Sequence, residues 1–157
     1  MKLLLPLALG LVALSGCSTS SRRAGGPAPQ AWITPVQAVI LAADAAPRGV
    51  RATFAMRVRS TGAQGDRIFL NSQPDYRDQR DLTIVIGPRV AEQLQERLGA
   101  DPRVALKGRD IRVTGWAVRT KIYFFANGEM TDKYYYQTHV NLIDARQLML
   151  ARRVAVD

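Results

Sequence analysis

Cysteine and histidine are nearly absent from this chain of 157 residues, which contains one of each. A single cysteine, Cys17, cannot form a disulfide within the chain or build a cysteine-based metal site. Lysine is also scarce, since only four of the 22 basic side chains are Lys. No uninterrupted apolar run approaches the roughly 20 residues that a membrane-spanning helix needs. These shortages exclude an internal disulfide framework and make a permanent transmembrane segment the weaker interpretation.

A short apolar segment follows Lys2 at the start of the chain and extends from Leu3 to Leu14. A cation followed by about 12 mostly apolar residues is the layout of a signal peptide. The segment ends in Leu14-Ser15-Gly16-Cys17, which resembles the lipobox of bacterial lipoprotein precursors. The resemblance implies that residues 1–16 are removed and that Cys17 becomes the lipidated amino terminus, with three acyl chains such as palmitate. The alternative is a plain secretory signal with an incidental cysteine.

The resemblance also implies where the protein resides. Three acyl chains make release from a membrane negligible, because each buried methylene contributes about 0.8 kcal/mol. Ser18 rather than Asp follows Cys17, which by analogy with enteric bacteria favours the outer membrane, facing the periplasm. Residues 17–30 are small and polar and are predicted to form a flexible linker with a reach of about 20 Å.

The formal net charge is +9, and most of the cations are Arg. Two interpretations remain open: guanidinium groups kept for phosphate contacts, or the composition of a GC-rich genome. A basic protein in the cell envelope could meet lipopolysaccharide, phospholipid headgroups, acidic polysaccharide or nucleic acid, and net charge does not separate these partners.

Residues 31–48 are predicted to form a short helix that leads into the domain. Thr34 is suited to the N-cap and Pro35 to the first turn, and Pro47 would end the helix. Apolar residues then recur at helical spacing. They are Val36, Val39, Ile40 and Ala43. An edge strand is the alternative.

The rest of the chain predicts five strands and one helix. The predicted strands are 51–59, 67–70, 82–86, 111–119 with a continuation at 121–125, and 134–143. In the first, Phe54, Met56 and Val58 alternate with polar residues, as in a half-buried strand. Segment 60–66 has the composition of a turn, and Asn127-Gly128 that of a hairpin turn. The helix, 89–98, follows Gly87-Pro88, ends at Gly99 and has an apolar stripe of Val90, Ala91, Leu94 and Leu98.

The fourth predicted strand contains a change of phase. Ile111 and Val113 point inward at odd positions, whereas Trp116 and Val118 would do so at even positions. Gly115 lies between the two pairs, which predicts a β-bulge there.

The order of three strands, a helix and two strands in about 100 residues resembles the OB-fold. Two stretches resemble those of bacterial periplasmic OB-fold proteins: Leu106-Lys107-Gly108-Arg109-Asp110-Ile111-Arg112-Val113-Thr114-Gly115 and Asp144-Ala145-Arg146-Gln147-Leu148. The resemblance implies that residues 49–157 form a mainly β domain, a small five-stranded Greek-key barrel with one helix between strands three and four. A β-sandwich would need more strands, and an open α+β sheet remains an alternative.

A row of polar side chains in the last strand comprises Tyr135, Gln137, His139 and Asn141. It is either a ligand-recognition strip or the solvated face of an antiparallel sheet, and the second interpretation is favoured because alternation alone produces such rows. No nucleophile elbow accompanies His139, so no catalytic residue is assigned.

The loop after the second strand contains Asp75, Asp78 and Asp81 among arginines. Their spacing does not match an EF-hand, so local salt bridges and loop capping are predicted and no metal or cofactor is assigned. The last hairpin is rich in aromatic and basic residues, which suits base stacking, cross-strand pairing or protein docking. They are Tyr123, Phe124, Phe125, Tyr134, Tyr135, Tyr136, Arg119, Lys121 and Lys133.

The sequence therefore favours a non-enzymatic, lipid-anchored binding or adaptor module that contacts an envelope protein. The alternative is the binding of nucleic acid or another polyanion through the same basic and aromatic surface. The candidate ligand-binding residues are Arg51, Arg57, Arg59, Tyr76, Arg77, Arg119, Lys121, Tyr123, Tyr135, Gln137 and His139.

Overall fold

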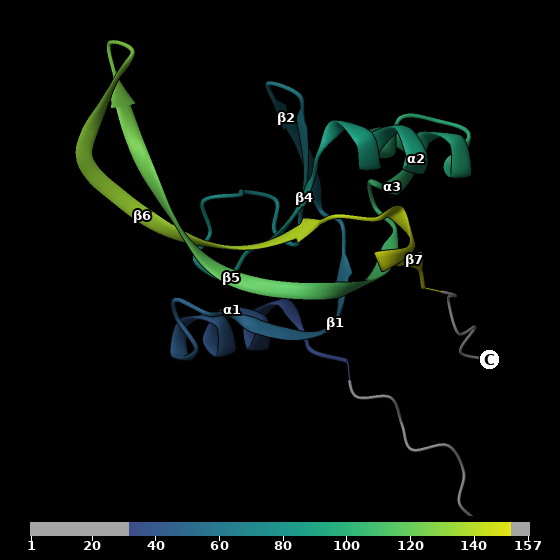
Figure 1. Ribbon diagram of the computed structural model, residues 1–157, viewed down its shortest axis with the longest axis horizontal. Helices are drawn as coiled ribbons and strands as arrows, with labels where there is room; N and C mark the ends of the chain where they lie inside the picture. Colours follow the sequence, from purple (N-terminus) through teal and green to yellow (C-terminus); the bar gives the residue numbers. More distant parts are fainter. Residues whose placement is uncertain (1–31, 152–157) are drawn as a thin grey trace, which may run out of the picture. The chain divides into compact units, whose positions relative to one another are not determined.

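The computed structural model describes residues 32–151, which fold around one β-sheet (Figure 1). The elements in chain order are α1 (Pro35–Asp44), β1 (Val50–Arg57), β2 (Ser60–Gln64), β3 (Arg67–Asn71), β4 (Leu82–Ile86), α2 (Pro88–Leu98), α3 (Pro102–Leu106), β5 (Asp110–Ala126), β6 (Glu129–Leu142), the 3-10 helix η1 (Ala145–Gln147) and β7 (Leu148–Leu150). The predicted signal peptide 1–16, the lipidation site Cys17 and the linker 17–30 lie outside the described residues.

The prediction of a mainly β domain is confirmed, but the described region contains seven strands rather than five. Their order is β1-β5-β6-β4-β3-β2, with β7 added to β5. Neighbours pair antiparallel except β4 and β6, which run parallel with Ile84 opposite Val140. None of the helices between residues 32 and 151 is long and apolar enough to cross a membrane.

The prediction of a turn over residues 60–66 is wrong for most of that segment. Residues Ser60 to Gln64 form β2, which pairs with β3 from Ser60 opposite Asn71 to Gln64 opposite Arg67. The turn is confined to Gly65-Asp66, where Gly65 has a φ of +59°. Strand β2 consists of small and polar residues without apolar alternation, and therefore its sequence does not indicate a strand.

The core is built largely as the alternation indicated. Phe54, Met56 and Val58 are buried, and every residue of β4 is buried. Helix α2 is confirmed: Val90 and Leu94 are buried, and Gly99 ends the helix in the left-handed region. The short α3, η1 and β7 were not predicted.

Helix α1 is confirmed, but the predicted buried face is wrong. Thr34 is the N-cap and forms a capping box with Gln37. Ala38 and Ala42 are fully buried, whereas Val36 and Ile40 are exposed. The small alanine side chains allow the helix backbone to approach the sheet closely, which turns the larger aliphatic residues outward.

The predicted bulge at Gly115 is also wrong. Strand β5 pairs with β1 without interruption from Arg57 opposite Asp110 to Val50 opposite Ala117. Trp116 is 53% exposed, whereas Gly115 is buried, and a Cβ at Gly115 would lie 2.8 Å from Cγ1 of Val140. The glycine therefore permits close packing and does not change the pleat. The register of β5 shifts later, between Tyr123 and Phe125.

Strands β5 and β6 continue beyond the rest of the sheet as a long curved hairpin (Figure 1). Residues 118–126 of β5 pair only with β6 in the described region, and residues 129–137 of β6 pair only with β5. The predicted turn is confirmed at Asn127-Gly128, where both φ angles are positive.

Candidate functional site

The hairpin of β5 and β6 presents two different faces, because directly opposed residues of an antiparallel pair share a face. One face carries cations and tyrosines: Arg119, Lys121, Tyr123, Tyr134 and Tyr136. The other carries Val118, Thr120, Ile122, Tyr135, Gln137 and His139. The predicted polar row and the predicted aromatic surface therefore lie mainly on opposite faces.

Aromatic rings pair across the two strands, as predicted for cross-strand stiffening. The rings of Tyr123 and Tyr134 lie 6.0 Å apart, and those of Phe124 and Tyr135 lie 5.3 Å apart. The guanidinium of Arg119 lies 3.8 Å from the centre of a tyrosine ring, that of Tyr136. Lys121 contacts Tyr134 in the same way at 4.4 Å. The cations are thus already held against ring faces by the strand register.

The polar row is a hydrogen-bonded chain. The amide nitrogen of Gln137 donates to the carbonyl of Tyr76 at 3.0 Å and to the hydroxyl of Tyr135 at 2.9 Å. The amide oxygen then faces Nε2 of His139 at 2.7 Å, so Nε2 carries the hydrogen and donates it. Tyr135, Gln137 and His139 are half-buried, so this row is partly covered rather than fully solvated.

Burial determines the protonation of this row. Desolvation lowers the pKa of His139 to about 4, so the imidazole is neutral at physiological pH. Burial also raises the pKa of the Tyr135 phenol, which keeps its hydroxyl proton. Because that hydroxyl accepts from Gln137, its own proton remains available to a ligand.

The loop between β3 and β4 is held by carboxylates, as predicted. Asp81 is buried and accepts from the hydroxyl of Ser72, the backbone of Gln73 and the hydroxyl of Thr83. Asp78 forms an ion pair with Arg80 at 2.7 Å. Between residues 32 and 151 no group of three or more His, Cys, Asp or Glu side chains is placed to hold a metal ion.

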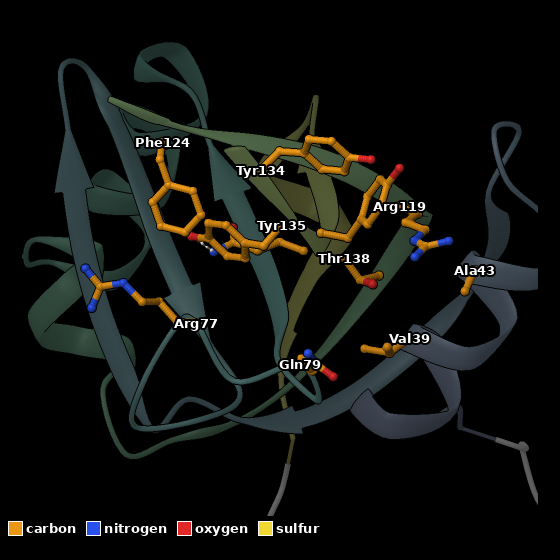
Figure 2. Close-up of a pocket in the computed structure, with 11 residues that line it drawn as sticks. Val39, Ala43, Arg77, Gln79, Arg119, Phe124, Tyr134, Tyr135 and Thr138 are labelled. Carbon is orange, nitrogen blue, oxygen red and sulfur yellow. Dashed lines mark hydrogen bonds between the residues drawn. The ribbon is translucent and has the colours of Figure 1, made fainter. Parts of the chain in front are cut away.

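A first cavity of about 590 Å³ lies between α1, this loop and the cation–tyrosine face of the hairpin. Figure 2 shows Arg77 and Arg119 on opposite sides of it, with Val39 and Ala43 contributed by α1. Its lining is Val39, Ala43, Arg77, Gln79, Arg119, Phe124, Tyr134, Tyr135, Tyr136, Gln137 and Thr138.

A second cavity of about 560 Å³ lies over the polar row. Strands β2, β3, β4, β5 and β6 contribute to its wall, and Tyr76 joins it from the loop. Its lining is Gly62, Ala63, Gln64, Arg67, Phe69, Asn71, Tyr76, Thr83, Val85, Thr120, Ile122, Tyr135, Gln137 and His139. Tyr135 and Gln137 line both cavities.

The candidate residues from the sequence fall into two groups. Six of them line one or both cavities: Tyr76, Arg77, Arg119, Tyr135, Gln137 and His139. Lys121 and Tyr123 extend the same hairpin. Arg51, Arg57 and Arg59 are exposed and line neither cavity; Arg57 lies 3.9 Å from Asp110.

Sequence reasoning missed the wall that α1 supplies to the first cavity and the wall that β2 and β3 supply to the second. Val39 was one of the apolar residues at helical spacing in the predicted helix, and Arg67 was the first residue of a predicted strand. No local pattern marks either residue, because each enters its cavity through the tertiary arrangement.

Comparisons with known proteins do not identify a family or a function for this chain. No family profile and no curated protein matches the sequence. One solved structure, described as "a putative aspartyl-tRNA synthetase from Leishmania major Friedlin", is similar over 82% of this chain and 22% of that chain, with 10% identity and a TM-score of 0.42. The chain therefore corresponds to about a fifth of that protein's length.

Proposed function

We propose that this protein is a non-enzymatic, lipid-anchored binding module of the cell envelope that docks onto a protein partner through the tip of hairpin β5–β6. The observation that carries the proposal is the directly opposed pair Phe125 and Met130, which are 68% and 62% exposed. They lie on a part of the hairpin that no third strand of the described region supports. Large apolar side chains gathered on an exposed projection are typical of a protein interface.

The anchor in this proposal is supported by the sequence. Leu14-Ser15-Gly16-Cys17 provides the lipidation signal, and 14 residues separate Cys17 from Trp32, where the described domain begins. Such a tether would place the domain about 20 Å from the outer membrane, in the periplasm. Replacement of Cys17 by Ala should release the mature protein from membrane fractions. Retention of that variant in membranes as mature protein, rather than as uncleaved precursor, would contradict the anchor.

The architecture in this proposal is an OB-like Greek-key barrel. Only Val58 and Arg59 separate β1 from β2, and both continue the backbone pairing: Val58 donates to Arg109 at 2.9 Å and Arg59 to Asn71 at 2.9 Å. β1 and β2 can thus be regarded as one bent strand that joins the two ends of the sheet. The parallel pair of β4 and β6 and the position of α2 between β4 and β5 support this arrangement.

The test of protein docking uses the tip. The lipidated protein is purified from membranes at low and at high salt, with a photo-crosslinking residue in place of Glu129, an exposed position next to the Phe125–Met130 pair. We expect one protein to crosslink at both salt concentrations. The double variant Phe125→Ser and Met130→Ser should lower its recovery by more than about tenfold, because truncation of buried interface anchors costs about 2 kcal/mol or more.

A matched control removes two other exposed apolar residues. Val104 and Ile143 are 74% and 82% exposed and lie outside the hairpin. The variant Val104→Ser and Ile143→Ser should recover the partner normally. Equal losses in both double variants, or none in the tip variant, would reject docking through the tip.

A second candidate function is the binding of an extended polyanion such as nucleic acid. The observation that favours it is that Arg67, Arg77 and Arg119 line the two cavities and no carboxylate does. This candidate predicts that affinity for an oligonucleotide falls steeply with salt, and that neutralising one phosphate-contacting Arg reduces the salt slope by about one. Salt-independent retention of a protein partner would favour the first proposal.

A further inference from the structure

We propose that the cavity between α1 and the hairpin binds a small anion carrying an aromatic or otherwise apolar body, a phosphate ester of an apolar alcohol, with Arg119 as its anion contact and Arg77 as a second positive charge at its rim. This site is independent of the tip, because neither Phe125 nor Met130 lines the cavity.

Arg77 makes no ion pair with the Asp two residues before it, unlike three other arginines in the same local sequence. Four segments share an Asp-x-Arg sequence in which the backbone N–H of Arg donates to the Asp carboxylate at 2.8 or 2.9 Å: 75–77, 78–80, 101–103 and 144–146. In three of them the guanidinium also pairs with the same carboxylate, at 2.6 to 2.8 Å. In the fourth, the guanidinium of Arg77 lies 4.6 Å from the ring of Tyr76 and lines the cavity.

Arg77 therefore stands apart from arginines in the same local setting. Its carboxylate neighbour, Asp75, is within reach, but no ion pair of Arg77 or Arg119 is found among residues 32–151. Figure 2 shows Arg119 beside the tyrosines of the hairpin, whereas the guanidinium of Arg77, at the opposite edge of the cavity, points away from them. Arg119 is therefore the cation that can contact a ligand inside, while Arg77 adds positive charge at the rim of a cavity whose lining contains no carboxylate.

The strand register holds Arg119 in position for this contact. It belongs to β5, and its guanidinium lies 3.8 Å from the ring centre of Tyr136 on the neighbouring strand β6. Stacking holds the planar group in place and leaves the N–H groups at its edge free to donate. That edge matches two oxygens of a phosphate or carboxylate.

The remaining wall selects an apolar body. Val39 and Ala43 come from α1, and Phe124 and the rings of Tyr134 and Tyr136 come from the hairpin. A volume of about 590 Å³ suits a ligand considerably larger than phosphate, within the roughly 300–1,000 Å³ of small-molecule sites. A soluble aryl phosphate and the headgroup region of an anionic phospholipid share this chemistry.

The test measures binding of phenyl phosphate, inorganic phosphate and phenol to the mature chain carrying Cys17→Ala. We expect saturable binding of phenyl phosphate at about 1 mM or tighter, with phosphate and phenol each about tenfold weaker. The methyl NMR signals of Val39 and Ala43 should shift on addition of phenyl phosphate. Absence of saturation at about 10 mM would overturn the proposal.

Three variants assign the anion contact. Arg119→Gln should weaken phenyl phosphate binding about tenfold, because a charge-assisted hydrogen bond contributes about 1.5 kcal/mol or more. Arg119→Lys should show most of this loss, since lysine has no planar fork. The matched control Arg89→Gln removes the same charge from the exposed start of α2 and should bind normally. An equal loss in the control, or normal binding by the lysine variant, would overturn the assignment.

Vesicles distinguish the two sources of ligand. If phosphatidylglycerol vesicles, but not phosphatidylcholine vesicles, retain the mature Cys17→Ala chain and release its Arg119→Gln variant, the ligand is a lipid headgroup. If neither vesicle retains the chain while phenyl phosphate binds, the ligand is soluble.

Discussion

The side chain of Gln137 joins two parts of the chain by donating a hydrogen bond to the backbone carbonyl of Tyr76 at 3.0 Å. It connects β6 to the loop between β3 and β4, and it does so at the boundary between the two cavities. This amide group therefore ties the middle of the loop to β6, whereas Asp81 holds the end of the loop.

Replacement of Gln137 by Ala should loosen the loop without unfolding the domain. We expect faster amide hydrogen exchange and proteolysis over residues 73–80, and a loss of global stability of about 1 kcal/mol. Gln137→Glu should loosen the loop as much, because an ionised carboxylate cannot donate to the carbonyl of Tyr76. Exchange rates unchanged from the native protein would show that other contacts position the loop.

Replacement of Gly115 by Ala should destabilise the sheet by about 1–3 kcal/mol, since its new Cβ would lie 2.8 Å from Cγ1 of Val140. Urea unfolding of the two single variants and of Gly115→Ala with Val140→Ala forms a double-mutant cycle. The double variant should be more stable than the sum of the single losses predicts. Strict additivity would exclude the steric contact as the cause.

The stability of the protein should fall as the pH decreases from about 6.5 toward 4. His139 has a pKa of about 4 when folded and 6.5 in the reference state, so the unfolded chain binds the proton first. The loss is fully absent above about pH 7 and reaches roughly 1–3 kcal/mol near pH 4.

The control for this pH effect is His139→Gln, which cannot titrate. The difference in unfolding free energy between native protein and variant should change over the same pH interval, and an NMR titration should find the imidazole neutral at pH 5.5. An imidazole pKa near 6.5 in the folded protein would contradict the prediction.

Asp81 should tolerate Asn better than Ala. Its two carboxylate oxygens accept three hydrogen bonds. The hydroxyl of Thr83 lies near acceptor oxygens of both Asp81 and Asn71, but its single proton can be donated to only one of them at a time. An Asn amide can donate to the hydroxyl of Thr83, which then donates to Asn71, so all three hydrogen-bond partners of residue 81 are kept. Burial also raises the pKa of Asp81, which shows that its charge is costly.

We expect Asp81→Asn to change the unfolding free energy by less than about 1 kcal/mol and Asp81→Ala to lower it by about 2–4 kcal/mol. Thermal and urea unfolding at pH 7 measure both. Equal destabilisation by the two substitutions would show that the carboxylate itself is required.

Strong periodicity made much of the fold predictable from the sequence. The alternation of Phe54, Met56 and Val58 placed β1, and the stripe of Val90 and Leu94 between Pro88 and Gly99 placed α2. Errors arose where packing chose small residues over large ones. In α1 the buried residues are Ala38 and Ala42, whereas Val36 and Ile40 are exposed. Gly115, where a bulge was predicted, instead lets the side chain of Val140 pack closely against the strand.

The candidate site was predictable only in part. The hairpin residues Arg119, Tyr135 and Gln137 were identified from composition, because aromatic and basic residues are adjacent in the sequence there. The opposing walls come from α1 and from β2 and β3, which lie at least 48 residues before Arg119 along the chain. Strand alternation could not show that the row containing His139 is covered, because coverage depends on how the sheet curls.

The parallel pairing of β4 with β6 has a consequence for how the chain reaches its native state. Hairpin β5–β6 can form within microseconds because its turn is local, whereas Ile84 must find Val140 across 56 residues. Sheet closure therefore belongs to the slow, late stage of folding, and until then β6 has an unpaired edge beside exposed aromatic side chains. A newly synthesised chain would need protection of that edge during this interval.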